Sequence, residues 1–267
     1  MSYWTDKIAL VTGGSAGLGR ALAEALAAAG ARLALAAIDA PQVAEVAERL
    51  RMAGQPAIGI HTDVTRQEQV AALVQQTIAE YGRLDALFNC AGRSVRGEVL
   101  ATTPEQFQSL WDLNFLGLVR CTAAAAPHLI QSQGHIVNIG SLAAKTASRY
   151  LGAYPASKFP VAAYSQQLRY ELNPRGVHVL LVCPGPIARP DAGRRYDDQA
   201  ADLPESARKP GAGVKLKGLP PEKLVARILR YCERRKPELV MPAKARLLFA
   251  ISQLSPTLGD WIIRRMT

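Results

Sequence analysis

The sequence predicts an α/β fold with one parallel, doubly wound sheet and helices on both of its faces. Three observations lead to this prediction. The chain has 267 residues, of which 49% are hydrophobic and 20% charged, as expected for a single soluble domain with a large core. Short apolar runs alternate with longer helix-forming stretches along most of the chain. The first run ends in a group of glycines, which is typical of the turn between a buried strand and a helix.

Seven segments have the short length and the apolar content of buried parallel strands. The first, Lys-Ile-Ala-Leu-Val-Thr, leads directly into the glycines, and the last is a short run near the C-terminus. The predicted strands are 7–12, 32–37, 57–61, 84–89, 134–139, 176–182 and 238–241. Right-handed crossovers should bring the C-terminal ends of these strands to one edge of the sheet, where ligands bind.

The stretches between the strands contain helix formers and helix-end signals. Gly30 ends the first helix, and Pro41 falls in the first turn of the second. Thr65 is expected to cap the third helix, with Glu68 at capping-box spacing, and Thr103 opens a long helix. The predicted helices are 18–29, 41–53, 65–81, 103–129, 150–172 and 220–235.

Two segments lie outside this alternation. Residues 186–219 are rich in Pro, Gly, Asp and Arg, with no clear period except over 191–201, and we expect a substrate loop or lid. Residues 243–267 predict a C-terminal helical extension of two helices, 243–254 and 256–266, following a main domain of residues 1–242. Three roles stay open for the extension: packing on the body or a partner subunit, lying on a membrane surface, or covering the substrate entrance.

Composition narrows the class of protein. The net charge is +10, and residues 186–267 hold 17 Lys and Arg against 9 Asp and Glu. This basic third fits an anionic substrate, an acidic membrane surface or a solvated surface, whereas nucleic acid is not expected because no nucleic-acid motif accompanies it. The four cysteines are far apart, so we expect reduced thiols, no metal site and a cytoplasmic protein. The N-terminus shows no signal peptide, and no uncharged apolar stretch approaches the roughly 20 residues of a membrane span.

The glycines of the first strand–helix turn predict a dinucleotide site. Gly13, Gly17 and Gly19 would allow a tight turn and a close approach of the backbone to a pyrophosphate, which the helix N-terminus then attracts. Similar turns also occur for packing reasons, and the position in the first βα turn favours the nucleotide.

A second group of residues could move a proton. Tyr154 and Lys158 lie four residues apart on one face of a predicted helix, and Ser141 ends a strand 13 residues before Tyr154. A free tyrosine has a pKa of about 10, so we expect the Lys158 ammonium, together with a cationic nicotinamide ring, to lower the Tyr154 pKa into a useful range. Ser141 could alternatively be a strand-end cap. Tyr3-x-x-x-Lys7 matches the same spacing but precedes the first strand, so we interpret it as a surface pair.

Together these motifs resemble the classical short-chain dehydrogenase/reductase family, whose Rossmann-type fold binds dinucleotides. The resemblance covers residues 5–241. It rests on residues 12–19, Asp63, the turn 89–92, Asn114, Ser141, Tyr154, Lys158 and residues 184–185. It implies that Ser141 holds the substrate oxygen, that Tyr154 is the acid or base, and that Asn114 anchors a water of a proton relay to Lys158. Asn114 could alternatively satisfy a buried backbone group.

The resemblance also implies the cofactor contacts. Asp63 and Val64 would meet the adenine, Asn89 with the Ala91-Gly92 turn would shape the adenosine pocket, and Lys158 would bond the nicotinamide ribose. Cys90 replaces the usual Asn of this turn, and Arg189 stands where a Thr often binds the carboxamide. The expected cofactor-binding residues are Gly13, Ser15, Gly17, Leu18, Gly19, Asp39, Asp63, Val64, Asn89, Ala91, Gly92, Tyr154, Lys158, Pro184, Gly185 and Ile187.

The end of the second strand bears on the choice of cofactor. An acidic residue there bonds the ribose 2′-hydroxyl of NAD and repels the 2′-phosphate of NADP. Asp39 lies two places beyond the usual position, and Ser15 and Ala16 in the glycine turn are neutral, so NAD is mildly favoured. Arg20 could still reach a phosphate.

The sequence therefore predicts an NAD(P)-dependent oxidoreductase that interconverts a secondary alcohol and a carbonyl by hydride transfer. The resemblance implies a homodimer or homotetramer. Steroid, lipid-derived, sugar and acyl-thioester ketones all stay open as substrates. The alternatives are a non-catalytic nucleotide-binding regulator or scaffold of the same fold and, more remotely, a Rossmann-type methyltransferase.

Overall fold

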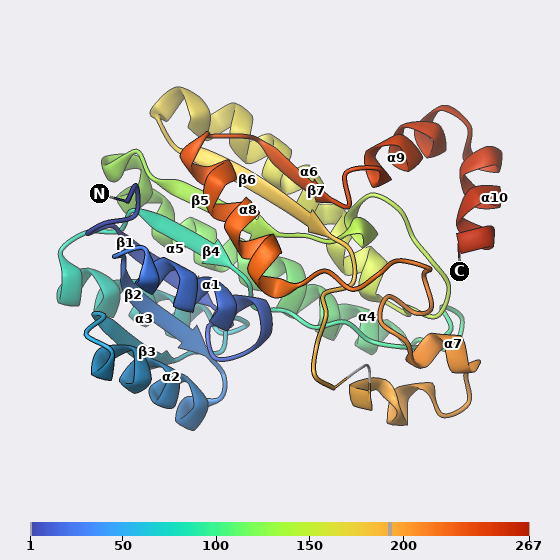
Figure 1. Ribbon diagram of the computed structural model, residues 1–267, viewed down its shortest axis with the longest axis horizontal. Helices are drawn as coiled ribbons and strands as arrows, with labels where there is room; N and C mark the ends of the chain where they lie inside the picture. Colours follow the sequence, from blue (N-terminus) through green and yellow to red (C-terminus); the bar gives the residue numbers. More distant parts are fainter. Residues whose placement is uncertain (1, 192–193, 267) are drawn as a thin grey trace.

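The computed structural model describes residues 2–191 and 194–266 and contains one seven-stranded sheet in the order β3-β2-β1-β4-β5-β6-β7 (Figure 1). All neighbouring strands are parallel, which confirms the predicted fold class. The strands are β1 Ile8–Thr12, β2 Arg32–Ala37, β3 Ala57–His61, β4 Ala86–Asn89, β5 His135–Ile139, β6 His178–Pro184 and β7 Glu238–Met241. Each lies within two residues of its predicted position.

The helices cover both faces of the sheet. On one face α1, α2 and α8 pack against side chains such as Val11 and Leu35, and on the other α3, α5 and α6 pack against side chains such as Leu10 and Leu87. Successive residues of β1 alternate between the two cores because strand side chains point to opposite faces. The helices are α1 Gly17–Ala28, α2 Ala40–Met52, α3 Gln67–Tyr81, α4 Pro104–Trp111, α5 Gly117–Ser132, α6 Tyr154–Leu172, α7 Glu205–Arg208, α8 Pro221–Glu233, α9 Ala245–Leu254 and α10 Pro256–Met266.

The helix starting at Thr103 is confirmed but contains a π-helical turn. Thr103 forms both bonds of a capping box with Gln106. The π turn, Asp112–Leu116, lies between α4 and α5 and holds Asn114. The stretch Pro104–Ser132 is long and apolar enough to cross a membrane by length and composition, but its side chains Cys121, Ala125 and Leu129 belong to the core beside the sheet.

Two predicted helix starts are wrong. The N-cap of α3 is Arg66 rather than Thr65, because Asp63 Oδ1 accepts bonds from both the Thr65 amide (2.9 Å) and its hydroxyl (2.8 Å). The helix expected from residue 150 begins only at Tyr154, because Tyr150 and Gly152 have φ of 61° and 47°, outside the right-handed helical region.

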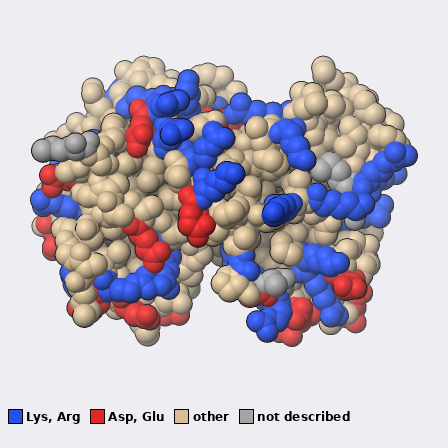
Figure 2. Space-filling view, viewed as in Figure 1, with Lys and Arg blue, Asp and Glu red and all other residues tan. Residues whose placement is uncertain are grey.

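The segment 186–219 wraps round one end of the molecule and contains little regular structure. Over 191–201, where the sequence shows some periodicity, it forms two 3-10 turns, Arg194–Tyr196 and Asp198–Ala200, and α7 follows. Residues 192–193 of this stretch, and Thr267 of the predicted extension, lie outside the described residues. Figure 2 shows that Lys and Arg outnumber acidic residues on the half of this face that contains the C-terminal helices.

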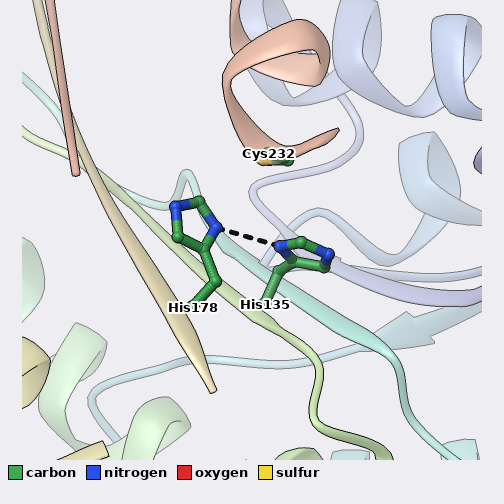
Figure 3. A group of neighbouring side chains, drawn as sticks. All are labelled: His135, His178 and Cys232. Carbon is green, nitrogen blue, oxygen red and sulfur yellow. Dashed lines mark hydrogen bonds between the residues drawn. The ribbon is translucent and has the colours of Figure 1, made fainter. Parts of the chain in front are cut away.

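Two histidines meet at the N-terminal edge of the sheet, far from the ligand edge. His135 and His178 are register partners at the first positions of β5 and β6, and their Nδ1 atoms lie 3.0 Å apart beside Cys232 of α8 (Figure 3). His178 Nε2 donates to the Lys236 carbonyl (2.8 Å), so its Nδ1 accepts from His135, whose Nε2 accepts from the Tyr3 hydroxyl (2.6 Å). All four ring nitrogens of the two histidines are therefore hydrogen-bonded, and the Tyr3 hydroxyl forms one end of this series of hydrogen bonds. Tyr3 and Lys7 thus lie away from the ligand edge of the sheet.

Candidate active site

One large cavity, of about 1010 Å³, lies along the C-terminal ends of the strands. Its wall runs from the glycine turn after β1, past the turn after β4 and the end of β5, to the segment after β6. It continues to α9 and α10 at the other end. The glycine turn and the Ser141–Tyr154–Lys158 group, 122 residues or more apart in the chain, thus face one space.

The glycine turn forms a cradle that side chains would fill. A Cβ on Gly19 would lie 2.1 Å from the Gly13 carbonyl oxygen, and a Cβ on Gly13 would lie 3.0 Å from Ala91. Gly13 and Gly17 also have φ of +66° and +53°, which side-chain-bearing residues rarely adopt. The N-cap of α1 is Ala16, which offers no side-chain acceptor to the first amides of the helix. A close backbone with free helix amides fits a dinucleotide pyrophosphate.

The neighbouring turn is fixed from β1. The Thr12 hydroxyl accepts from the amides of Cys90 (3.1 Å) and Ala91 (3.2 Å), which holds the turn after β4 against the cradle. Asn89 lies buried behind this wall and does not line the cavity. Its Nδ2 donates to Thr122 (3.1 Å) and Asn138 (2.9 Å), so it braces β4 against α5 and β5.

The other expected cofactor residues line the cavity: Ser15, Leu18, Asp39, Asp63, Val64, Gly92, Pro184, Gly185 and Ile187. The Asp39 carboxylate accepts from the Gln42 amide (2.9 Å) and so caps α2, while the Gln42 side chain accepts from Ser15 (2.7 Å). Arg189 extends toward the cradle, with Nη2 3.6 Å from the position of a Cβ on Gly17. Arg189 thus adds positive charge at the glycine turn rather than a carboxamide contact.

Ser141 and Tyr154 meet at the end of β5. Both side chains line the cavity, and the Ser141 hydroxyl acts to lower the Tyr154 pKa. The Ser141 hydroxyl also accepts from the Ala143 amide (3.0 Å), so it caps the short turn after the strand as well. Tyr154 is the first residue of α6, and the helical spacing places Lys158 one turn further along the same face. The geometry therefore shows the cap considered for Ser141, and its side chain also lines the cavity.

Electrostatics correct one expectation. Burial raises the pKa of Tyr154 to about 12, partly opposed by the Ser141 hydrogen bond and the Arg96 charge. Lys158 does not provide the expected lowering, because its Nζ donates to the Ile139 carbonyl (2.9 Å) and burial lowers its own pKa to about 8. Removing the phenolate from water outweighs the attraction that sequence proximity suggested.

Asn114 is buried in the π turn and does not line the cavity. Its Oδ1 accepts from the Arg93 amide, and its Nδ2 donates to the Arg93 carbonyl and to Ser157, each at 2.9 Å. A Cβ on Gly92 would lie 2.7 Å from this Oδ1 and 3.6 Å from Lys158 Nζ. The side chain thus satisfies buried backbone groups directly beside Lys158.

Sequence reasoning missed Arg96, a buried cation on the cavity wall. Its guanidinium donates to the carbonyls of Ala207 (2.6 Å), Val95 (2.9 Å) and Lys209 (3.2 Å) and lies 3.7 Å from the ring of Tyr196. It therefore ties the loop after β4 to the segment 186–219. No local sequence signal announces this role, because most of these partners lie about a hundred residues away.

Comparisons with known proteins agree with this geometry. The model of the short chain dehydrogenase family matches residues 7–200. An uncharacterized oxidoreductase of Staphylococcus saprophyticus is 34% identical over 76% of this chain and 89% of its own length. A ketoacyl reductase of Nostoc sp. is 30% identical over 99% of this chain and 90% of its own. A diacetyl reductase of Staphylococcus epidermidis is 31% identical over 75% and 79%.

Solved structures of the same family share the fold. A short chain dehydrogenase/reductase of Burkholderia phymatum in complex with NAD superposes with a TM-score of 0.81, at 26% identity over 95% of this chain and 96% of that one. A short-chain dehydrogenase of Streptomyces avermitilis gives 0.79, at 28% identity over 96% and 97%. The chain therefore belongs to the short-chain dehydrogenase/reductase family and is an oxidoreductase that acts on CH–OH groups.

Proposed function

We propose that this protein interconverts a secondary alcohol and a ketone with a nicotinamide cofactor, using Tyr154 as the general acid or base. The observation that carries the proposal is that Ser141, Tyr154 and Lys158 line the same cavity as the glycine cradle. A bound nicotinamide ring supplies or accepts the hydride. The family relatives that reduce ketoacyl groups and diacetyl support this class of reaction.

The residues of the protein have separate roles in orienting the substrate and in moving the proton. Ser141 orients the substrate oxygen toward Tyr154, whose hydroxyl donates a proton to that oxygen in reduction and takes one from it in oxidation. In this proposal Lys158, whose Nζ donates to the Ile139 carbonyl, bonds the nicotinamide ribose and supplies positive charge beneath the site. Asn114 positions the wall next to Lys158 and is the proposed start of the relay that returns the proton to solvent.

The glycine cradle, Asp63, Val64 and residues 184–187 would hold the dinucleotide. We propose that Asp39, which lines the cavity at the end of β2, favours NAD over NADP by repelling a 2′-phosphate. We assign residues 1–242 to the catalytic domain, 186–219 to the substrate segment, and 243–267 to the extension. The four free thiols fit the reducing cytoplasm that we propose as its location. We also propose a homo-oligomer, for which the exposed aromatic residues Trp111, Phe159 and Tyr170 on α4 and α6 offer a contact face.

Replacing Tyr154 by Phe tests the reaction. Loss of the hydroxyl should lower turnover of a ketone panel by about 10²–10⁴-fold, because a positioned acid or base contributes that much, while NADH binding stays within twofold. Tyr170→Phe, an exposed phenol outside the cavity, is the matched control. A Tyr154→Phe enzyme that keeps more than about a tenth of the wild-type rate would remove the assigned role. If the wild type binds NADH tightly but oxidises none across the panel, the regulator alternative is favoured instead.

Arg189 and Asp39 predict distinct effects on nucleotide affinity. Arg189→Ala should weaken NADH and NADPH equally, by about 5- to 20-fold, because it removes a charge beside the pyrophosphate cradle. Asp39→Asn should tighten NADPH and leave NADH nearly unchanged. Dissociation constants from nucleotide fluorescence measure both. Arg20→Gln is the control for a nearby cation, because Arg20 bonds Glu24 (3.0 Å) and does not line the cavity. Tighter NADPH than NADH binding by the wild type would contradict the NAD preference.

A further inference from the structure

The C-terminal helices α9 and α10 carry two groups of apolar side chains, one in the cavity wall and one at exposed positions. They pack on each other and stand out at one end of the molecule, away from the sheet (Figure 1). The first group closes the far end of the cavity and consists of Leu248, Phe249, Ile251, Ile262 and Ile263. Leu247 lines the same cavity and is 67% exposed, so it lies at the rim. An apolar substrate entering the cavity would meet this wall first.

The second group of apolar side chains on α9 and α10 faces solvent. Leu254, Leu258 and Trp261 are 87%, 48% and 50% exposed, and none of them lines the cavity. They gather round the turn between the two helices and the first half of α10. We call these three residues the outer patch. Apolar residues gathered at one exposed site, with a Trp among them, are typical of a surface that meets another apolar phase.

Cations flank the outer patch. Residues 244–265 contain four basic residues and one acidic residue. The Arg265 guanidinium lies 4.0 Å from the Trp261 ring, and Lys215 Nζ donates to the Arg265 carbonyl (3.1 Å). Arg264 and Arg265 form no ion pair with any carboxylate within residues 2–191 and 194–266. Their charge is therefore available to an anionic partner.

The positive charge beside the outer patch favours an anionic membrane over a second copy of this protein as its partner. A second copy of the chain would bring the same cations against it, and each copy carries a net charge of +10. A bilayer with anionic phospholipids offers an apolar interior for Trp261 and the two leucines and negative headgroups for the arginines.

We propose that the α9–α10 hairpin docks on anionic phospholipid membranes through the outer patch, and that the cavity behind it receives a lipid-derived alcohol or ketone from the bilayer. The docking part stands on the hairpin alone. The substrate part rests on the proposed function, because it names the class of molecule that reaches Tyr154.

Flotation of the full-length protein with vesicles tests the docking. Binding to phosphatidylcholine vesicles containing phosphatidylglycerol should be at least tenfold stronger than binding to phosphatidylcholine alone. Arg264→Gln/Arg265→Gln should weaken binding about 25-fold, from about fivefold for each charge near the surface. Leu254→Ser/Leu258→Ser/Trp261→Ser should weaken it at least tenfold. Lys223→Gln/Arg227→Gln, which removes the same charge from exposed positions of α8, is the matched control and should change binding less than twofold.

Several results would overturn the docking. They are absence of wild-type binding to anionic vesicles, an equal loss in the α8 control, or a change in the molar mass of the outer-patch variant by light scattering. The last result would assign the patch to a second copy. Tyr154→Phe should bind vesicles like the wild type, so docking and catalysis fail separately.

Turnover tests the substrate class. A long-chain 2-alkanone presented in anionic vesicles should have a kcat/KM at least 100-fold above that of a short soluble 2-alkanone. The outer-patch variant should lose this advantage while keeping its turnover of the short ketone. Turnover of the short ketone without any long-chain advantage would overturn the substrate class and leave the reaction standing. Vesicle binding without turnover of either ketone would instead overturn the proposed function.

Discussion

At the scale of single residues, burial decides the chemistry of the site more than neighbouring charges do. Tyr154 is enclosed by the wall of the cavity, and burial raises its pKa to about 12 although Arg96 and Ser141 act against this. Lys158 is buried as well, and its pKa falls to about 8. The protein without nucleotide therefore keeps Tyr154 protonated, which is the state that the proposed proton donor of ketone reduction needs.

Tyrosine ionisation should show this directly. In the nucleotide-free protein, a titration at 295 nm from pH 7 to 10 should give the same tyrosinate signal for the wild type and for Tyr154→Phe, because a pKa near 12 leaves Tyr154 neutral throughout this range. Tyr170→Phe, which removes an exposed phenol, is the matched control. A smaller signal for Tyr154→Phe below pH 9 would mean that Lys158 does lower the phenol pKa.

At the scale of elements, one guanidinium holds the substrate segment in place. Arg96 bonds carbonyls on both sides of the gap between the loop after β4 and α7. Burial lowers its pKa, and the ring of Tyr196 beside it acts in the opposite direction. The Arg96 amide also donates to Gln199 Oε1 (2.9 Å), so this one residue bonds the segment through its backbone and its side chain.

Arg96→Met should loosen the segment 186–219. Leaving buried carbonyls without donors costs about 1–3 kcal/mol each, so we expect at least tenfold faster limited proteolysis within this segment. KM for the ketone should rise more than kcat falls. Arg208→Met, an exposed arginine of α7, is the matched control and should cleave at the wild-type rate. Equal cleavage of the wild type and Arg96→Met would show that other contacts hold the segment.

At the scale of the whole molecule, the hydrogen-bonded histidine pair links the sheet's N-terminal edge to stability in acid. Burial lowers the pKa of His135 to about 3 and that of His178 to about 4. The unfolded chain binds protons on these rings at about pH 6.5, whereas the folded protein does not. The contribution of these two neutral histidines to folding stability is therefore complete above about pH 6.5. It is lost progressively as the pH falls toward 4.

Thermal unfolding between pH 7 and 5 checks this linkage. The wild-type Tm should fall steadily over this range, where most carboxylates stay ionised. His135→Asn/His178→Asn should start from a lower Tm and depend less on pH. His61→Asn, on an exposed histidine, should follow the wild type. A wild-type Tm independent of pH, or an unchanged slope in the double variant, would contradict the linkage.

The sequence predicted the sheet closely because buried strands and helices have distinct periods that local residues determine. It also predicted that Ser141, Tyr154 and Lys158 lie close together, because the C-terminal ends of parallel strands meet at one edge of the sheet. It missed the Asp63 bonds that displace the Thr65 cap and the positive φ of Tyr150 that delays α6. It could not find Arg96, whose partners are distant in the chain, nor the burial that sets the Tyr154 pKa.

The order of parts along the chain has a further consequence. Every residue proposed for chemistry precedes β7, whereas the far end of the cavity is closed by the C-terminal tail with α9 and α10. Exchanging this tail for that of a relative would retarget the catalyst without disturbing its reaction centre. The C-terminus is therefore the natural place at which to begin engineering new selectivity.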